Sequence, residues 1–227
     1  MHLPGLLFQR RGTSPEAPYG RSIESVSDPL EQTIRLVTRA REGDADSFAQ
    51  LYERVAPAVH TWAELRIRPS QRNVLEPTDL VQEVWLRAWR GLEGLDIETV
   101  PFRPWIFRIA KNVLLEGLRR AQTRDGGPAA GSSTRQFAVA NVPDAVTAVS
   151  RRLVRDESIQ AFTEEVRELE ADDQKLVTHC GLEGLPYAEV GTRLGLSTDA
   201  VAKRWRRLRA KLSERGLPDI LVLETPG

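Results

Sequence analysis

Apolar residues near the C-terminal end of the chain repeat at helical spacing. Four of them fall at i, i+4, i+7 and i+11, which is the spacing of one buried stripe on an α-helix. These four are Val201, Trp205, Leu208 and Leu212. A shorter apolar set within residues 187–194 predicts a small helix just before it. Gly195 lies between the two and suits a tight turn, because glycine adopts a positive φ without strain.

The second of these two helices is predicted to carry a cationic face. Ser197 or Thr198 can accept its first free N–H groups, and Asp199 suits its positive end. The side away from the apolar stripe bears Lys203, Arg204, Arg207 and Lys211. Basic amphipathic helices are often only solvated surfaces. Here the preceding helix and the glycine turn favour a helix-turn-helix that reads the DNA major groove.

A wider apolar stripe in the middle of the chain predicts another amphipathic helix. Its members are Leu80, Val81, Val84, Trp85, Ala88 and Leu92. The opposite side bears Asp79, Gln82, Glu83, Leu86 and Arg90. Leu86 is an apolar residue inside an otherwise polar face. An apolar centre with charged surroundings is typical of a protein-docking surface.

A third amphipathic helix is predicted to end near Arg120. Its core stripe consists of Trp105, Ile106, Ile109, Ala110 and Val113, and a second face bears Arg108, Asn112, Leu115 and Arg119. Asparagine can pair with the polar edge of an exposed base, and arginine with a phosphate or a base. The neighbouring aromatic residues could stack on unpaired bases, but most are expected in the core, Trp85 and Trp105 among them.

These patterns predict an all-α fold of two small helical domains joined by a flexible linker. We expect a disordered tail over residues 1–27, an N-terminal domain over 28–120, a Gly/Ala/Ser-rich linker over 121–147, a C-terminal domain over 148–215 and a second tail over 216–227. No strand alternation and no internal repeat is visible.

Composition narrows the function. The chain has 32 Lys and Arg against 32 Asp and Glu, but the charge is segregated, acidic around residues 156–173 and basic around 203–211. Segregated charge in a neutral chain favours one DNA-facing surface and other surfaces for protein partners. Three histidines, one cysteine and no Gly-rich phosphate loop argue against an enzyme, a metal site or a cofactor.

The single cysteine, Cys180, forms no intramolecular disulfide and is compatible with a reducing cytoplasm. No apolar run reaches the length of a membrane span, and residues 3–8 are too short for the core of a signal peptide. We therefore expect a cytoplasmic protein.

Four segments together resemble the extracytoplasmic-function group of bacterial RNA polymerase sigma factors. Residues 43–52 resemble the start of sigma region 2, and residues 79–89 resemble its core-polymerase-binding helix, which is the most specific match. Residues 101–120 resemble the segment that melts and recognises the minus-ten element, and residues 187–208 resemble the helix-turn-helix of region 4. The match covers about residues 39–212.

The resemblance implies partners and roles for individual residues. Docking on the coiled coil of the largest polymerase subunit would involve Asp79, Gln82, Glu83 and Leu86. The minus-ten element would be met by Arg108, Asn112, Arg119 and Arg120, and the loop before Phe102 would hold a flipped base. The minus-thirty-five element would be met by Thr198, Lys203, Arg204, Arg206 and Arg207. The acidic helix near Glu164 and Glu165 would face the polymerase flap, and an anti-sigma factor is a further partner of such proteins.

The sequence departs from the family pattern at several positions. Lys111 stands where arginine is common, Glu116 where aspartate is usual, Trp205 where leucine is usual and Ala202 where lysine is frequent. A rival interpretation is a helix-turn-helix repressor or activator with an N-terminal sensor domain, which predicts dimers and a palindromic site. The helix at residues 79–89 and the face with Arg108 and Asn112 argue against it, because a sensor needs neither.

Overall fold

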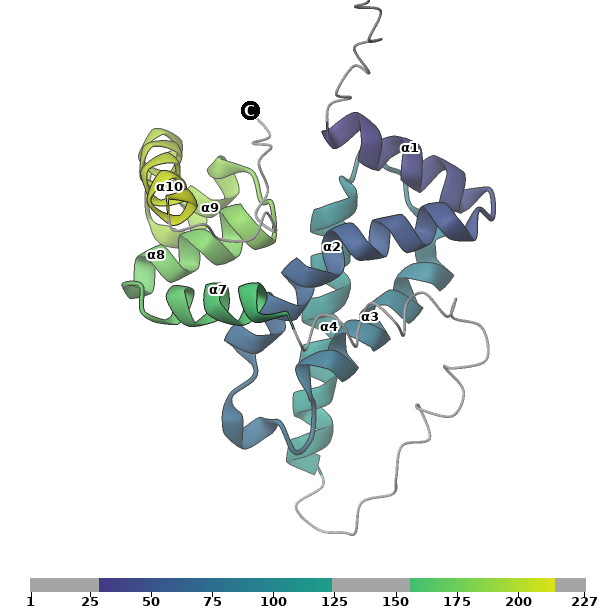
Figure 1. The fold of residues 1–227 in the computed structure, drawn as a ribbon, viewed down its shortest axis with the longest axis horizontal. Coiled ribbons are helices and arrows are strands. Elements are labelled where there is room, and N and C mark those ends of the chain that lie inside the picture. The colour runs from purple at the N-terminus through teal and green to yellow at the C-terminus, as the bar shows by residue number, and fades with distance from the viewer. Residues whose placement is uncertain (1–28, 124–155, 215–227) are drawn as a thin grey trace, which may run out of the picture.

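The computed structural model describes residues 29–123 and 156–214, and every regular element in these two ranges is a helix (Figure 1). The prediction of an all-α fold is therefore confirmed. Both predicted tails, and nearly all of the predicted linker at 121–147, lie outside the described residues.

Four long helices build an N-terminal lobe. They are α1 (Pro29–Arg41), α2 (Ala45–Arg66), α3 (Pro77–Gly91) and α4 (Phe102–Thr123), with short 3-10 turns η1 (Pro69–Gln71) and η2 (Leu92–Gly94) between them. Asp44 begins α2, because its carboxylate accepts the N–H groups of Asp46 and Ser47 at 3.0 and 3.2 Å. Pro57 lies inside α2, and the helix runs through it without a break over its 22 residues.

Aromatic rings fill the centre of this lobe. Trp85 is fully buried and contacts the rings of Phe48, Tyr52 and Phe102 at centroid distances of 5.5, 4.8 and 6.1 Å. Trp105 is also buried, so both tryptophans lie in the core as predicted. Phe102 and Phe107 are equally buried. Stacking on unpaired bases is therefore excluded for Phe102 and Phe107 as well as for the two tryptophans that were expected in the core.

The C-terminal lobe contains the helix-turn-helix. Its elements are α7 (Glu157–Arg167), α8 (Ala171–Leu176), the π-helical turn η4 (Val177–Leu182), α9 (Tyr187–Leu194) and α10 (Thr198–Ser213). Gly195 ends α9 with φ 68°, and the Ser197 hydroxyl accepts the Ala200 N–H at 3.2 Å to begin α10. All four residues of the predicted stripe are buried: Val201, Trp205, Leu208 and Leu212.

Gly191 controls how closely the turn packs against α9. A Cβ atom at this position would lie 2.5 Å from the carbonyl oxygen of Leu196, and that oxygen belongs to the backbone. We expect Gly191→Ala to destabilise the protein by about 1–3 kcal/mol because the turn must move to relieve the overlap. Thermal unfolding measures the effect. The matched control is Gly195→Asn, since asparagine tolerates a positive φ and the space around Gly195 is open. Equal melting temperatures for the two variants would contradict this account of the turn.

The two lobes pack against each other. Helix α7 lies along the C-terminal half of α2 (Figure 1), and η4 contacts the same helix. Buried residues of both lobes belong to one continuous apolar cluster, to which α7 contributes Ile159, Phe162 and Val166. This leaves α3, α4 and α10 with long faces that point away from the core.

Candidate nucleic-acid and protein-docking surfaces

The polar face of α3 is only partly open to solvent. Gln82 is exposed, and Asp79 and Glu83 are half-buried. Leu86 differs from the prediction, because it is only 5% exposed and so offers no exposed apolar centre. Helical spacing correctly placed Leu86 on the side of α3 opposite the apolar stripe. The expected exposure of Leu86 was wrong, because spacing along one helix does not show which residues pack over that helix. The described face is therefore an acidic and amide surface.

An ion-pair network joins this face to α4. The Arg87 guanidinium donates to Glu83 Oε1 at 2.7 Å and, through its two terminal nitrogens, to both carboxylate oxygens of Glu116 at 2.9 and 2.7 Å. The bond to Glu116 raises the pKa of Arg87 and lowers the pKa of Glu116. Glu116 also lies 3.6 Å from Arg120. The sequence alone indicates no role for Arg87, because its partner Glu116 is on another helix.

The second face of α4 is open to solvent. Arg108, Asn112, Arg119 and Arg120 are all exposed, as predicted. Leu115 lies among them and is 51% exposed. Lys111 is next to Asn112 in sequence but points elsewhere, toward the C-terminal lobe. The face therefore presents three cations, one amide and one aliphatic side chain to a ligand.

The loop before α4 is held by a single carboxylate. Asp96 accepts the Glu98 N–H at 3.2 Å and the Thr99 hydroxyl at 3.0 Å, while its carbonyl accepts the Val100 N–H at 2.9 Å. Such local bonds fix the backbone of the loop without help from a sheet or a helix. The loop that leads into α4 is thus fixed by its own bonds.

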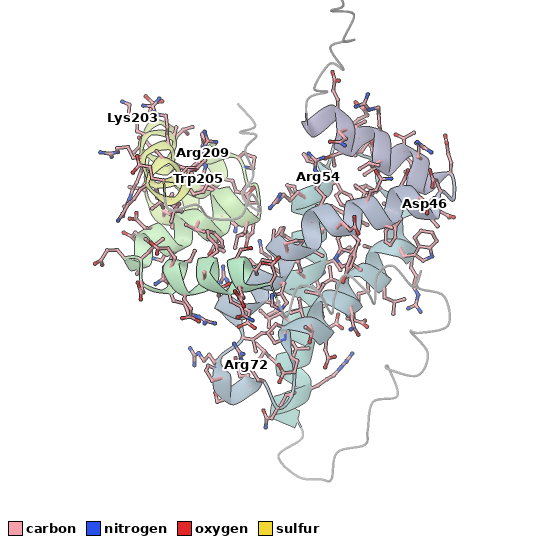
Figure 2. All side chains as sticks on the ribbon, viewed as in Figure 1. Asp46, Arg54, Arg72, Lys203, Trp205 and Arg209 are labelled. Carbon is pink, nitrogen blue, oxygen red and sulfur yellow. The ribbon has the colours of Figure 1, made fainter. Side chains whose placement is uncertain are left out.

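The cationic face of α10 points away from the rest of the molecule (Figure 2). Thr198, Lys203, Arg206 and Arg207 are exposed, as predicted. Figure 2 shows Lys203 at the outer side of α10. Arg204 differs, because it is half-buried and its Nε donates to Asp173 at 2.9 Å. This contact braces α10 against α8, so Arg204 does not stand free for a ligand.

Other kinds of site find little support in the described residues. Within 29–123 and 156–214, no three His, Cys, Asp or Glu side chains gather as they would around a metal ion. Burial raises the pKa of the Cys180 thiol to about 12, which makes it a poor nucleophile. Among the helices described, none is long and apolar enough to cross a membrane.

Comparison with known protein families identifies the two lobes that carry these surfaces. The family model for sigma-70 region 2 matches residues 51–124, which include α3 and α4. The family model for sigma-70 region 4 matches residues 159–212, which include the helix-turn-helix. The chain is an extracytoplasmic-function RNA polymerase sigma factor. It directs promoter-specific transcription initiation, and the alternative of a repressor with a sensor domain is not supported, because region 2 occupies the place of the sensor.

Curated relatives of this sigma factor are similar over most of their length. NccH of Alcaligenes xylosoxydans xylosoxydans, an RNA polymerase sigma factor, is 29% identical over 178 residues, which are 78% of this chain and 91% of NccH. The ECF sigma factor SigL of Mycobacterium tuberculosis is 27% identical over 186 residues, which are 80% of this chain and 97% of SigL. A solved structure of CnrH in complex with the cytosolic domain of CnrY is 24% identical and covers 81% of this chain and 96% of CnrH, with a TM-score of 0.39.

Proposed function

We propose that three helix faces of this sigma factor each bind a different part of the transcription complex. The polar face of α3 docks on the coiled coil of the largest polymerase subunit, the exposed face of α4 meets the minus-ten element, and the cationic face of α10 meets the minus-thirty-five element. The observation that carries the proposal is that each face lies opposite a buried stripe of its own helix, so the core holds it toward solvent.

Polymerase docking on α3 rests on Asp79, Gln82 and Glu83. The salt bridge to Arg87 holds the Glu83 carboxylate in place before any partner arrives, which lowers the entropy lost on binding. Through Arg87 and Glu116, the same network reaches the helix that contacts the minus-ten element. Docking and promoter contact are therefore built on one rigid pair of helices.

Minus-ten recognition on α4 rests on Arg108, Asn112, Arg119 and Arg120. Asn112 can bond the polar edge of an exposed base, while the arginines bind phosphates and give affinity that falls with salt. The loop held by Asp96 receives a flipped base, as the resemblance to other sigma factors implies. Base recognition is then possible only where the duplex is already opened.

Replacing Arg108 and Asn112 together with alanine tests this assignment. We expect promoter opening to fall by about tenfold to 100-fold, because one base contact and one phosphate contact are lost. Opening is measured by permanganate reactivity of thymines in the minus-ten element with assembled holoenzyme. Binding to core polymerase should not change, since both side chains are exposed and neither takes part in the bonds of Arg87 to Glu83 and Glu116. Normal opening by this variant would contradict the assignment.

Minus-thirty-five recognition on α10 rests on Thr198, Lys203, Arg206 and Arg207. Thr198 is the first residue of α10, where free N–H groups also bind phosphate. Arg204 positions the helix through Asp173 and is not proposed as a free base contact. Tethering two modest DNA readers to polymerase raises the effective concentration of each, so neither needs high affinity alone.

Several features of the whole protein follow from this proposal. The chain supplies promoter choice and no catalytic group, since polymerase forms the bonds. It acts in the cytoplasm, where core polymerase works. We keep the domain limits as a proposal, 28–120 and 148–215 with a linker at 121–147, except that α4 extends the first domain to Thr123. The acidic stretch of α7 near Glu164 and Glu165 faces the polymerase flap. A protein regulator that binds the sigma factor, as CnrY binds CnrH, is a further partner.

A further inference from the structure

Glu183 is a fully buried carboxylate at the contact between the two lobes. It belongs to the C-terminal lobe and is 0% exposed. Its Oε1 accepts the indole N–H of Trp62 at 2.9 Å, and its Oε2 accepts the ammonium of Lys111 at 2.7 Å. Both donors belong to the N-terminal lobe, 121 and 72 residues away in sequence. The carboxylate therefore obtains two of its hydrogen bonds only while the lobes are in contact.

The fold of the C-terminal lobe aims Glu183 at this contact. The Glu183 N–H bonds the Thr178 carbonyl at 2.9 Å at the end of η4, and Gly184 then turns the chain with φ 67°. His179 adds a third bond to the carboxylate, 3.1 Å from its Nδ1. The glutamate is thus held by its own lobe in the orientation that the other lobe requires.

Further polar contacts cross the same boundary. Arg103 Nε donates to the Leu182 carbonyl at 2.7 Å, next to Glu183 in sequence. Arg167 Nη2 donates to the Glu64 carbonyl at 3.0 Å and lies 3.2 Å from its carboxylate. Directional bonds of this kind specify one relative placement of the lobes. An apolar contact alone would allow more than one placement.

The charge state of Glu183 fits this arrangement. Burial alone would raise its pKa, but the hydrogen bonds from His179, Lys111 and Trp62 lower it to about 2. An ionised carboxylate is costly to bury unless such donors compensate it. Separating the lobes exposes the carboxylate to water, which solvates it in place of these donors. A partner that binds only the open arrangement can therefore shift the equilibrium between the closed and open states.

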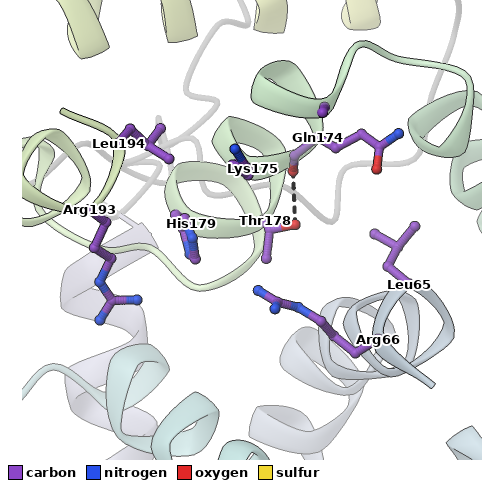
Figure 3. Close-up of a pocket in the computed structure, with 9 residues that line it drawn as sticks. Leu65, Arg66, Gln174, Lys175, Thr178, His179, Arg193 and Leu194 are labelled. Atoms are coloured by element: carbon purple, nitrogen blue, oxygen red, sulfur yellow. Dashed lines mark hydrogen bonds between the residues drawn. The ribbon is translucent and has the colours of Figure 1, made fainter. Parts of the chain in front are cut away.

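A cavity of about 530 Å³ lies between the lobes, and three of the residues that line it, Arg66, His179 and Arg193, lie close to the Glu183 carboxylate. Figure 3 shows Arg66 of α2 pointing into it, across from His179 and Arg193 of the C-terminal lobe. Arg66 and Arg193 lie 3.9 and 3.8 Å from the Glu183 carboxylate. The boundary is therefore polar and incompletely filled on this side, unlike an obligate apolar interface.

Promoter geometry is incompatible with this closed arrangement. The minus-ten and minus-thirty-five elements are nominally 25 base pairs apart, which is about 85 Å at about 3.4 Å per base pair. A compact body of about 150 residues has a radius of gyration near 15 Å and a diameter of roughly 40 Å. Since α4 and α10 are parts of one such body here, they cannot reach both elements of a straight duplex until the lobes separate.

We propose that Glu183, bound to Trp62 and Lys111, is a clasp that keeps the free sigma factor closed and unable to span a promoter. The inference rests on the proposed roles of α4 and α10. Polymerase, whose coiled coil and flap offer separate docking sites, binds the open arrangement and must pull the clasp apart. The clasp therefore lowers the affinity of the free protein for core polymerase in proportion to the closed fraction.

Energy transfer between two dyes tests the clasp in the free, full-length chain. The dyes are placed on Gln50→Cys of α2 and Ala210→Cys of α10, both exposed, in a Cys180→Ala background. Glu183→Gln removes the charge, and we expect transfer efficiency to fall and the affinity for core polymerase to rise about tenfold. A tenfold rise is expected if only about 10% of the unmutated protein is in the open state that binds polymerase. Lys111→Met breaks the same bond from the other lobe and should act in the same direction.

Glu157→Gln is the matched control, because it neutralises an exposed glutamate of the C-terminal lobe that makes no contact with Glu183 or its partners. It should change neither transfer efficiency nor affinity. Unchanged transfer in both Glu183→Gln and Lys111→Met would overturn the clasp, as would lobe opening without any gain in polymerase affinity. Failure of the unmutated protein to bind core polymerase would instead overturn the proposed function, so the two failures are distinguishable.

Discussion

Replacing Lys203 and Arg207 together with alanine is expected to abolish promoter selection without affecting the binding of core polymerase. Both side chains are exposed on α10, outside the buried stripe that holds the helix. A good base contact contributes about 1–3 kcal/mol, so losing two contacts lowers promoter affinity by about 100-fold or more. Each lost phosphate contact also reduces the salt slope by about 0.9.

Fluorescence anisotropy of reconstituted holoenzyme on labelled promoter fragments measures both quantities. The matched control is Arg35→Ala with Arg68→Ala, which removes two exposed cations from the N-terminal lobe and so changes net charge equally. This control should bind the promoter within about twofold of the unmutated protein. If both double variants lost the same affinity, overall charge and not the α10 face would explain binding.

Replacing Gln82 and Glu83 together with alanine is the second prediction with a large effect. We expect affinity for core polymerase to fall by about 100-fold, because truncated polar residues leave their partners in the interface unpaired. The fold should survive, since Arg87 keeps its two bonds to Glu116 when Glu83 is removed. Sedimentation or surface-binding measurements with purified core polymerase report the affinity, and thermal unfolding reports the fold.

Glu42→Ala with Gln50→Ala is the matched control for α3. It also removes one glutamate and one glutamine from exposed positions of the N-terminal lobe, but away from α3. It should bind polymerase normally. Loss of binding by the α3 variant together with a large fall in melting temperature would show that these residues support the fold and do not form a docking surface.

Local features of this protein could be predicted from its sequence. The helix-turn-helix was predictable because its signals lie within a few residues of one another: the stripe ending in Leu212, the turn at Gly195 and the cap at Ser197. The exposed faces of α4 and α10 followed from the same periodicity. Helical spacing fixes which residues share a face, so these predictions did not depend on tertiary contacts.

Features that depend on a second element could not be predicted in this way. Leu86 was placed on the correct side of α3 and is nevertheless buried, and Arg204 was placed on the cationic side of α10 but pairs with Asp173. Glu183 was not singled out at all, since its partners are 121 and 72 residues away. Such contacts arise from the packing of helices, which a single sequence does not reveal.

Run-off transcription with purified core polymerase and promoter-bearing fragments tests the central claim most directly, that separate faces of one sigma factor grip polymerase and read promoter DNA. The unmutated chain should start transcription at a defined site. The Gln82/Glu83 variant should regain activity when its concentration is raised about 100-fold, whereas the Lys203/Arg207 variant should stay inactive at that promoter even when holoenzyme is saturated. Identical rescue of both variants by concentration, or activity of neither under any condition with both folded, would contradict the division of labour between α3 and α10.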